Sequence, residues 1–139
     1  DAMAEEMDSA AFRTLLSKSS MNLKAFLLSQ RYISGLGNIY VDESLFRSHL
    51  HPSLPASRLN RKQAVGLYRH IRDVLTEAID NMGSTISDYR DTYGNPGENQ
   101  NFFRVYGRAG KPCQECGAVV KKIRFAGRGT YYCPDCQKP

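Results

Sequence analysis

Four cysteines near one end of the chain limit its possible folds more than any other residues do. They form two C-x-x-C pairs, Cys113 with Cys116 and Cys133 with Cys136, separated by 16 residues. Each pair can place two thiolates on one metal ion, and a spacer of this length fits a hairpin that brings the pairs together. Four sulfurs complete a tetrahedral zinc site and leave no open position for a substrate. The spacing therefore predicts one structural Zn²⁺ in a zinc ribbon and a reducing compartment; a disulfide or redox pair is the alternative.

The spacer between the cysteine pairs carries a candidate contact residue. Gly127-Arg128-Gly129 is typical of the tip of a β-hairpin, and strand-like residues lie around Val105, Ile123 and Tyr131. A long cationic side chain between two glycines packs poorly into a core, but it is well placed to reach a nucleic-acid groove or phosphates. A solvated turn arginine is the alternative.

The residues before the cysteines favour helices. Apolar residues recur with helical spacing, Asn22 and Asn60 are candidate N-caps, and Gly83 is a candidate C-cap. We expect helices at 3–18, 22–30, 38–48 and 60–82, followed by a polar, turn-rich loop at 84–100. The fold class is thus mainly α with a small β module, divided into a helical domain over 1–100 and a four-cysteine zinc finger over 101–139.

Charge distinguishes the second of these parts. The chain has 139 residues and a net charge of +5 at pH 7, and residues 101–139 carry eight lysines and arginines against two acidic residues. Such a basic module favours a polyanionic partner such as nucleic acid, with a merely solvated surface as the alternative. No apolar run is long enough for a membrane span and the start does not resemble a signal peptide, so we expect no membrane partner.

A second candidate site precedes the third expected helix. Gly35-Leu36-Gly37-Asn38 combines two glycines, which take positive φ at little cost, with free N–H groups at a helix start that favour an anion. Lys24, on the preceding helix, could meet the same phosphate backbone, although most glycine turns of this kind are connectors. Asp42 and Glu43 are adjacent on a helix and point in different directions, so they are not predicted to form a general acid–base pair.

The three histidines and the remaining motifs indicate no catalytic centre. His49, His51 and His70 lack the spacing of a metal site or a triad, and we interpret them as surface or packing residues. No phosphate-binding loop of the Walker type is present.

Several motifs together resemble one family, the formamidopyrimidine-DNA glycosylase and endonuclease VIII group, and are closer to its first branch. The resemblance covers nearly the whole chain from about residue 10. It is carried by Lys24-Ala25-Phe26-Leu27-Leu28-Ser29-Gln30, by Gly35 through Phe46, by His51-Pro52, by Val105-Tyr106-Gly107-Arg108, and by the hairpin from Gly127 through Gln137.

The resemblance implies a helix–two-turns–helix domain followed by a zinc β-hairpin, which together grip the damaged strand of double-stranded DNA. Lys24, Gly37, Asn38 and Tyr106 match positions that hold phosphates beside the lesion. Arg128 matches the zinc-finger arginine that grips phosphates and is assigned a catalytic role as proton donor in δ-elimination.

The function implied for the whole protein is base-excision repair. The family removes oxidised purines such as 8-oxoguanine and nicks the resulting abasic site, and residues 84–100 match the loop that covers the extruded base. The resemblance also implies one structural zinc ion, a monomer, and a place in the bacterial cytoplasm in association with the nucleoid.

The nucleophile of the family is an N-terminal proline, whose secondary amine forms a Schiff base with the sugar. This chain begins Asp1-Ala2, and none of its six prolines stands at its start. We therefore expect the chain to be the DNA-gripping half, cut away from the catalytic half, and to be inactive by itself. The alternative is a stand-alone zinc-ribbon nucleic-acid-binding module with no enzymatic parent.

Overall fold

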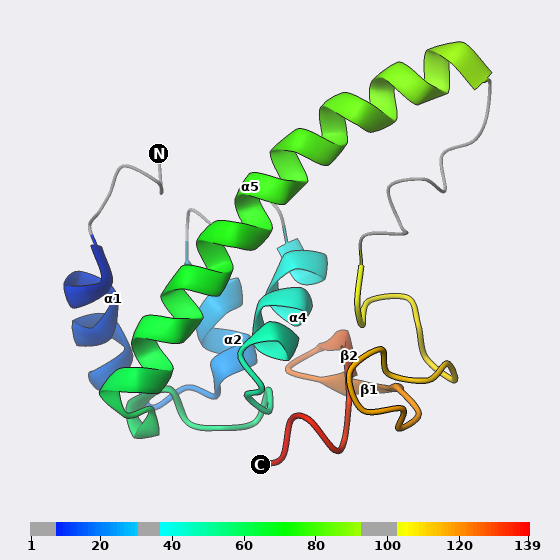
Figure 1. The fold of residues 1–139 in the computed structure, drawn as a ribbon. Helices are drawn as coiled ribbons and strands as arrows, with labels where there is room; N and C mark the ends of the chain where they lie inside the picture. Colours follow the sequence, from blue (N-terminus) through cyan, green and yellow to red (C-terminus); the bar gives the residue numbers. More distant parts are fainter. Residues whose placement is uncertain (1–7, 31–36, 93–102) are drawn as a thin grey trace.

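A computed structural model describes residues 8–30, 37–92 and 103–139 of the chain (Figure 1). Along these residues the elements are α1 (Asp8–Ser17), α2 (Leu23–Leu28), α4 (Gly37–Arg47), the 3₁₀ turn η1 (Ala56–Arg58), α5 (Arg61–Thr92), β1 (Lys121–Phe125) and β2 (Arg128–Tyr132). The fold is mainly helical with a two-stranded antiparallel hairpin, as the sequence predicts. The long helix α5 crosses the molecule, with α1 on one side and α4 and the hairpin on the other.

The helical part has its own core along α5. Leu67, Ile71 and Leu75 are buried on one face of this helix, and α1 and α4 pack against it. Phe12 of α1 is fully buried, and its ring lies 5.6 Å from that of Tyr68. Each such side chain contributes about 1.5–3 kcal/mol when it is removed from water. This cluster therefore forms a firm frame for the shorter helices.

Side-chain caps start two helices where the sequence predicts them. Asn22 Oδ1 accepts a hydrogen bond of 2.7 Å from the Ala25 N–H. Asn60 and Gln63 exchange two bonds of 2.9 and 2.8 Å, which is the reciprocal arrangement of a capping box. The helix predicted at 3–18 is present as α1, and residues 3–7 lie outside the described part of the chain.

The end of α5 differs from the prediction. Gly83 does not cap the helix, which continues to Thr92, so the beginning of the predicted loop is helical and residues 93–100 lie outside the described part. A glycine inside a helix costs only about 1 kcal/mol relative to alanine. Proline ends helices because it lacks an N–H and clashes with the preceding turn. After Gly83 the first proline is Pro96.

The hairpin has a two-residue turn that places Arg128 at the start of a strand. Ala126 and Gly127 take φ of 54° and 76°, and positive φ at both central residues defines the type I′ turn that suits twisted strands. Phe125 pairs with Arg128, and Arg124 with Gly129. The tip is therefore Ala126-Gly127 rather than Gly127-Arg128-Gly129, and Arg128 is exposed beside it.

A second, smaller core joins the cysteine module to the helices. Phe46 of α4 is fully buried together with Val105, Val120 and Cys133. The sequence predicts a strand around Val105, but the chain turns there, with the Arg108 N–H bonded to the Val105 carbonyl at 3.1 Å. The apolar Val105 fills this core instead of extending a sheet. Helix α4 contributes buried side chains to both cores, Leu45 to the larger one and Phe46 to the smaller one.

Candidate metal centre and nucleic-acid interface

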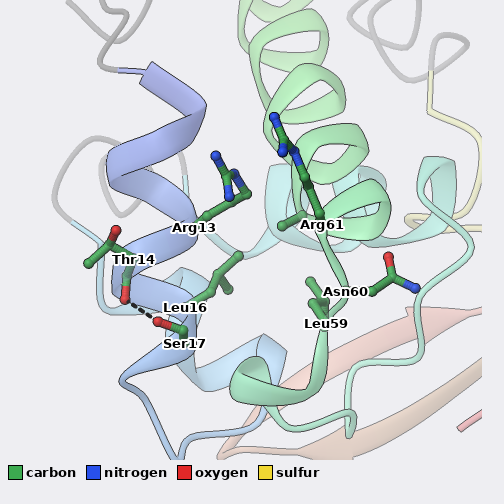
Figure 2. Close-up of a pocket in the computed structure, with 8 residues that line it drawn as sticks. Arg13, Thr14, Leu16, Ser17, Leu59, Asn60 and Arg61 are labelled. Atoms are coloured by element: carbon green, nitrogen blue, oxygen red, sulfur yellow. Dashed lines mark hydrogen bonds between the residues drawn. The ribbon is translucent and has the colours of Figure 1, made fainter.

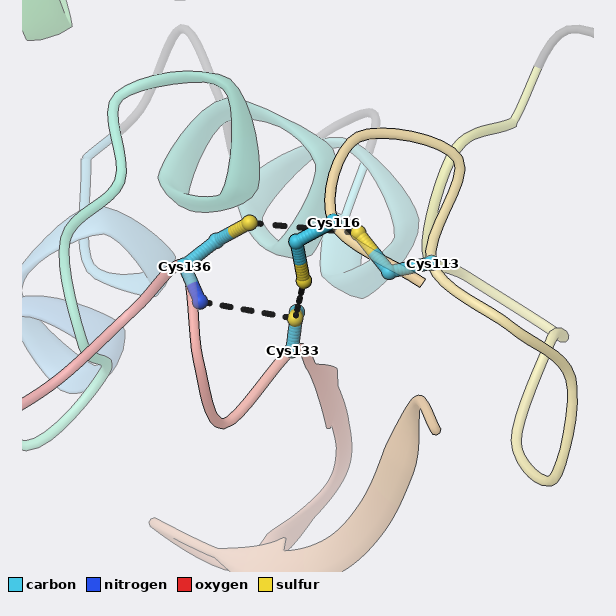
Figure 3. Close-up of side chains that lie close together, drawn as sticks. All are labelled: Cys113, Cys116, Cys133 and Cys136. Carbon is cyan, nitrogen blue, oxygen red and sulfur yellow. Dashed lines mark hydrogen bonds between the residues drawn. The ribbon is translucent and has the colours of Figure 1, made fainter. Parts of the chain in front are cut away.

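The four cysteine sulfurs converge on one point (Figure 3). All four Sγ atoms lie within 4.8 Å of one another. The Cys113 and Cys136 sulfurs are 3.8 Å apart, and those of Cys116 and Cys133 are 3.4 Å apart, well beyond the roughly 2.05 Å of a disulfide. Sulfurs at about 2.3 Å from a tetrahedral zinc ion stand roughly 3.8 Å apart. The geometry fits one zinc ion held by four cysteines.

Backbone N–H groups support these sulfurs as thiolates. The amides of Glu115, Ala118 and Cys136 point at the sulfurs of Cys113, Cys116 and Cys133 at 3.3, 3.5 and 3.4 Å. Burial raises the pKa of the Cys133 and Cys136 thiols, and a bound Zn²⁺ would hold them as thiolates. All four ligand positions are filled by protein, so the zinc is structural and binds no substrate.

The glycine turn and the hairpin meet at the start of α4. Gly37 takes φ of 73°, the conformation for which the sequence predicts a glycine there, and begins the helix. The Asn38 side-chain Nδ2 donates a hydrogen bond of 2.8 Å to the Gly129 carbonyl, next to Arg128. Two candidate phosphate-binding residues far apart in the sequence, Asn38 and Arg128, are thus brought to one surface. Gly35 and Leu36 lie outside the described residues.

Lys24 lies directly behind this surface rather than on it. Its side chain is fully buried, and Nζ is bonded to Asp42 Oδ1 of α4 at 2.5 Å. Burial lowers the pKa of Lys24 against the effect of Asp42, and the nearby charge of Arg128 lowers it further. Burial also raises the pKa of Asp42 to about 6, although Lys24 opposes this. For both groups burial outweighs the mutual attraction, as is common for ion pairs removed from water.

Tyr106, a further candidate phosphate-binding residue, packs against β2. Its ring lies 4.7 Å from the ring of Tyr131 on β2 and 6.0 Å from that of Phe103. A cavity of about 440 Å³ opens beside Phe103 and Tyr106. Its lining combines apolar, aromatic and cationic side chains, namely Ile39, Phe103, Tyr106, Arg108 and Lys111, with Gly107 and Gln114. Aromatic and cationic groups around one cavity suit a planar, anionic ligand such as a nucleotide.

Glu43 is a structural residue of the interface that the sequence analysis did not identify. Its carboxylate is 1% exposed and accepts hydrogen bonds of 2.8 to 3.0 Å from the backbone N–H groups of Arg104, Val105 and Tyr106. Asp42 points elsewhere, to Lys24 and the Tyr131 N–H, as expected for adjacent helix residues. Two neighbouring acids amid apolar helix residues were the available signal, but their partners lie up to 89 residues away.

The histidines have separate local partners, in keeping with surface or packing roles. His49 Nε2 lies 2.8 Å from Glu115 Oε1, the rings of His51 and Tyr132 meet edge to face with their centroids 5.1 Å apart, and His70 Nδ1 is 3.0 Å from the Ser48 hydroxyl. A second depression, of about 240 Å³, lies between α1 and the start of α5 with the side chains of Arg13 and Arg61 on its rim (Figure 2). It contains none of the candidate phosphate-binding residues.

Among the described helices, none is both long enough and apolar enough to cross a bilayer.

Comparison with known proteins matches both parts of the chain. The family model described as the formamidopyrimidine-DNA glycosylase H2TH domain covers residues 1–90, and that of the zinc finger found in FPG and IleRS covers residues 110–139. A formamidopyrimidine-DNA glycosylase of Thermus thermophilus is 51% identical over 124 residues, which are 88% of this chain and 46% of the relative. That of Nitratidesulfovibrio vulgaris is 44% identical over 96% of this chain and 36% of the relative.

Solved structures agree with the sequence comparison. The MutM (FPG) protein of Thermus thermophilus superposes with a TM-score of 0.84 at 45% identity, over 99% of this chain and 52% of that one. The Lactococcus lactis enzyme, bound non-covalently to DNA containing an abasic site, gives 0.83 at 40% identity, over 98% of this chain and 48% of that one. The chain thus spans about half the length, or less, of the relatives that it matches. Because the glycosylase domain model matches well over half of its residues, the chain belongs to the formamidopyrimidine-DNA glycosylase family.

Proposed function

We propose that this chain is the DNA-binding part of a base-excision repair enzyme that removes oxidised purines, such as 8-oxoguanine, and nicks the abasic site. The observation that carries the proposal is the meeting of α4 and β2, where the Asn38 side chain contacts the Gly129 carbonyl beside the exposed Arg128. Relatives of this chain were solved on DNA with an abasic site or a formamidopyrimidine lesion, which supports a damaged duplex as the partner.

In this proposal the interface holds phosphates of the damaged strand. The Gly37 N–H lies at the helix start, where an anion is favoured, and the Asn38 amide has a second N–H besides the one bound to Gly129. The guanidinium of Arg128 provides a fixed positive charge on the same surface, and Tyr106 offers a hydroxyl beside the adjoining cavity. These contacts are with the sugar–phosphate backbone of the DNA, so binding is nearly independent of base sequence.

A titration of DNA binding against salt tests this function. A short duplex with a stable abasic-site analogue is the probe, and each phosphate contact contributes a slope of about −0.9 to log K against log salt. Arg128→Ala should weaken binding and reduce the slope by roughly one contact. Arg69→Ala, which removes an exposed arginine of α5, is the matched control and should bind like the wild type. Salt-independent binding, or equal losses in both variants, would contradict the proposal.

Chemistry at the lesion is assigned to the part of the relatives that this chain does not cover. The guanidinium of Arg128 has no free lone pair with which to attack the sugar, so Arg128 is not the nucleophile. We propose for it the proton-donor role in δ-elimination that the family resemblance implies, with the proton that it gives to the leaving group replaced from solvent. The 139-residue polypeptide should not form a borohydride-trapped adduct with damaged DNA above the level of an inert basic protein. Specific trapping would show that the nucleophile is present here.

The setting in which the chain acts is a further part of this proposal. We propose that the protein works as a monomer on double-stranded DNA in the bacterial cytoplasm, in association with the nucleoid. The four cysteines close enough for one zinc ion support a reducing compartment. A stand-alone zinc-ribbon module is disfavoured because the glycosylase domain model matches the helical residues as well.

A further inference from the structure

Two side chains of α4 hold the outer edge of β2. Asn38 Nδ2 donates to the Gly129 carbonyl at 2.8 Å, and Asp42 Oδ2 accepts from the Tyr131 N–H at 3.0 Å. Backbone groups two residues apart on a strand point to the same edge, and β1 occupies the other edge of this two-stranded sheet. Asn38 and Asp42 are one helical turn apart, so α4 takes the place of a third strand.

The second oxygen of Asp42 extends this contact to α2. Asp42 Oδ1 is bonded to Lys24 Nζ, and both side chains are fully buried. One carboxylate therefore joins α2, α4 and β2 at a point three residues from Arg128 in β2. A lysine in this place has no solvent-facing surface with which to meet a phosphate.

We propose that Asp42 and Lys24 form a positioning pair, in which Asp42 fixes the placement of β2, and with it Arg128, while Lys24 neutralises Asp42 without touching DNA. This inference rests on the proposed DNA-binding function and deepens it. Lys24 can reach a phosphate directly only by leaving a buried carboxylate without its cation, which is a costly state. The charge of Lys24 therefore acts inside the protein, on Asp42, and not on DNA.

The arrangement separates two roles that one substitution would otherwise confuse. Arg128 acts through its own charge on the DNA, whereas Lys24 and Asp42 act on the position of Arg128. Removing a contact to phosphate changes the salt dependence of binding. Removing a positioning residue leaves Arg128 able to reach its phosphate, but only at the cost of ordering β2 on binding, so the affinity falls while the number of released ions stays nearly the same.

A double-mutant cycle in the zinc-loaded chain tests the pair, with the abasic-site duplex as the probe. Lys24→Met, Asp42→Asn and the double variant are compared with the wild type for affinity and salt slope. Asparagine keeps an oxygen for the Tyr131 N–H but removes the charge. Each single substitution should weaken binding by about 3- to 30-fold with the wild-type slope, and the double variant should lose no more than the worse single one.

The opposite pattern would overturn the proposal. If Lys24 binds a phosphate directly, Lys24→Met lowers the slope by about one contact, Asp42→Asn leaves binding unchanged or strengthens it, and the two effects add. The amide signal of Tyr131 in ¹H–¹⁵N spectra gives a readout that is independent of DNA. Its shift should move in Lys24→Met, because Lys24 and the Tyr131 N–H are bonded to the two oxygens of the same carboxylate, and an unmoved signal in that variant would also contradict the proposal.

Two further comparisons keep the cycle decisive. If a single variant fails to fold, the double variant, which has no buried charge at this point, decides by its slope and affinity. Wild-type binding and the Arg128→Ala slope test the proposed function separately. A salt-dependent wild type with an additive cycle would refute the positioning pair alone, whereas a wild type that does not bind DNA would refute the function.

Discussion

Buried polar side chains, beside the apolar contact of Phe46 with Val105, join α4 to the start of the cysteine module. Glu43 is the strongest example, because one buried carboxylate receives the N–H groups of three successive residues, Arg104, Val105 and Tyr106. These amides would otherwise be unsatisfied within a turn that also carries a candidate DNA contact. A substitution that changes one atom of this carboxylate should therefore lower the stability of the module.

Glu43→Gln is expected to destabilise the chain by about 2–4 kcal/mol, since bonds to a charged acceptor are worth about 1.5–3 kcal/mol each and are not additive. The glutamine keeps one acceptor oxygen but turns an NH₂ group toward backbone donors. Denaturant unfolding of the zinc-loaded protein measures the loss. Glu115→Gln, at an exposed glutamate whose carboxylate pairs with His49 on the surface, should change stability by less than about 1 kcal/mol. Equal effects would show that Glu43 is not a structural anchor.

The buried carboxyl of Asp42 should make stability depend on pH. Burial raises its pKa from 3.8 to about 6, so the native state holds this proton more tightly than the unfolded chain does. The contribution of Asp42 to the free energy of unfolding therefore increases as the pH falls through 6, and it is lost as the pH rises toward neutral. Between pH 7.5 and 5.5, the free energy of unfolding of the wild type relative to Asp42→Asn should increase by about 1 kcal/mol. A constant difference across this range would contradict the raised pKa.

At the scale of elements, the accuracy of the sequence-based predictions depended on how local each cause was. The caps at Asn22 and Asn60 act within three residues, and the cysteine spacing defines its own metal site, so both could be predicted. Gly83 misled the prediction because a glycine only weakens a helix, while no proline follows it until after Thr92. The sequence alone gave no sign that Lys24 is buried, because its partner Asp42 is 18 residues away.

The hairpin turn offers a stabilising substitution at the same scale. Ala126 has φ of 54°, which costs a residue with a Cβ roughly 1–2 kcal/mol, and Gly127 follows it. Ala126→Asn creates Asn-Gly, the preferred pair for a type I′ turn, and should raise stability by about 0.5–1 kcal/mol. Thermal unfolding at saturating zinc measures the change. Ala109→Asn, at an exposed alanine that is not among the positive-φ residues, is the matched control, and an equal gain there would point to a general surface effect.

At the scale of the whole molecule, the two cores share α4 but depend on different forces. The larger core, around Leu67 and Phe12, consists of apolar side chains, whereas the smaller one is built around Phe46 and two of the zinc-binding cysteines. Metal binding supplies about 10–16 kcal/mol of folding free energy in small zinc modules, more than a core of this size provides. Loss of zinc should therefore unfold one core and spare the other.

Chelation of zinc is expected to unfold residues 104–139 while most of the helical part survives, with α4 as the element caught between. Without the module Phe46 is exposed, and Asp42 and Glu43 lose the Tyr131 and Arg104–Tyr106 amides that they bind. Hydrogen exchange after treatment with a chelator should therefore show full loss of protection in β1 and β2, partial loss in α4, and protection retained in α1 and the part of α5 around Leu67. Re-addition of zinc should restore all three, which separates metal loss from cysteine oxidation. Simultaneous loss of protection in α1, α4 and α5 would mean that the molecule has one cooperative core, and unchanged protection in the hairpin would mean that zinc does not hold the module together.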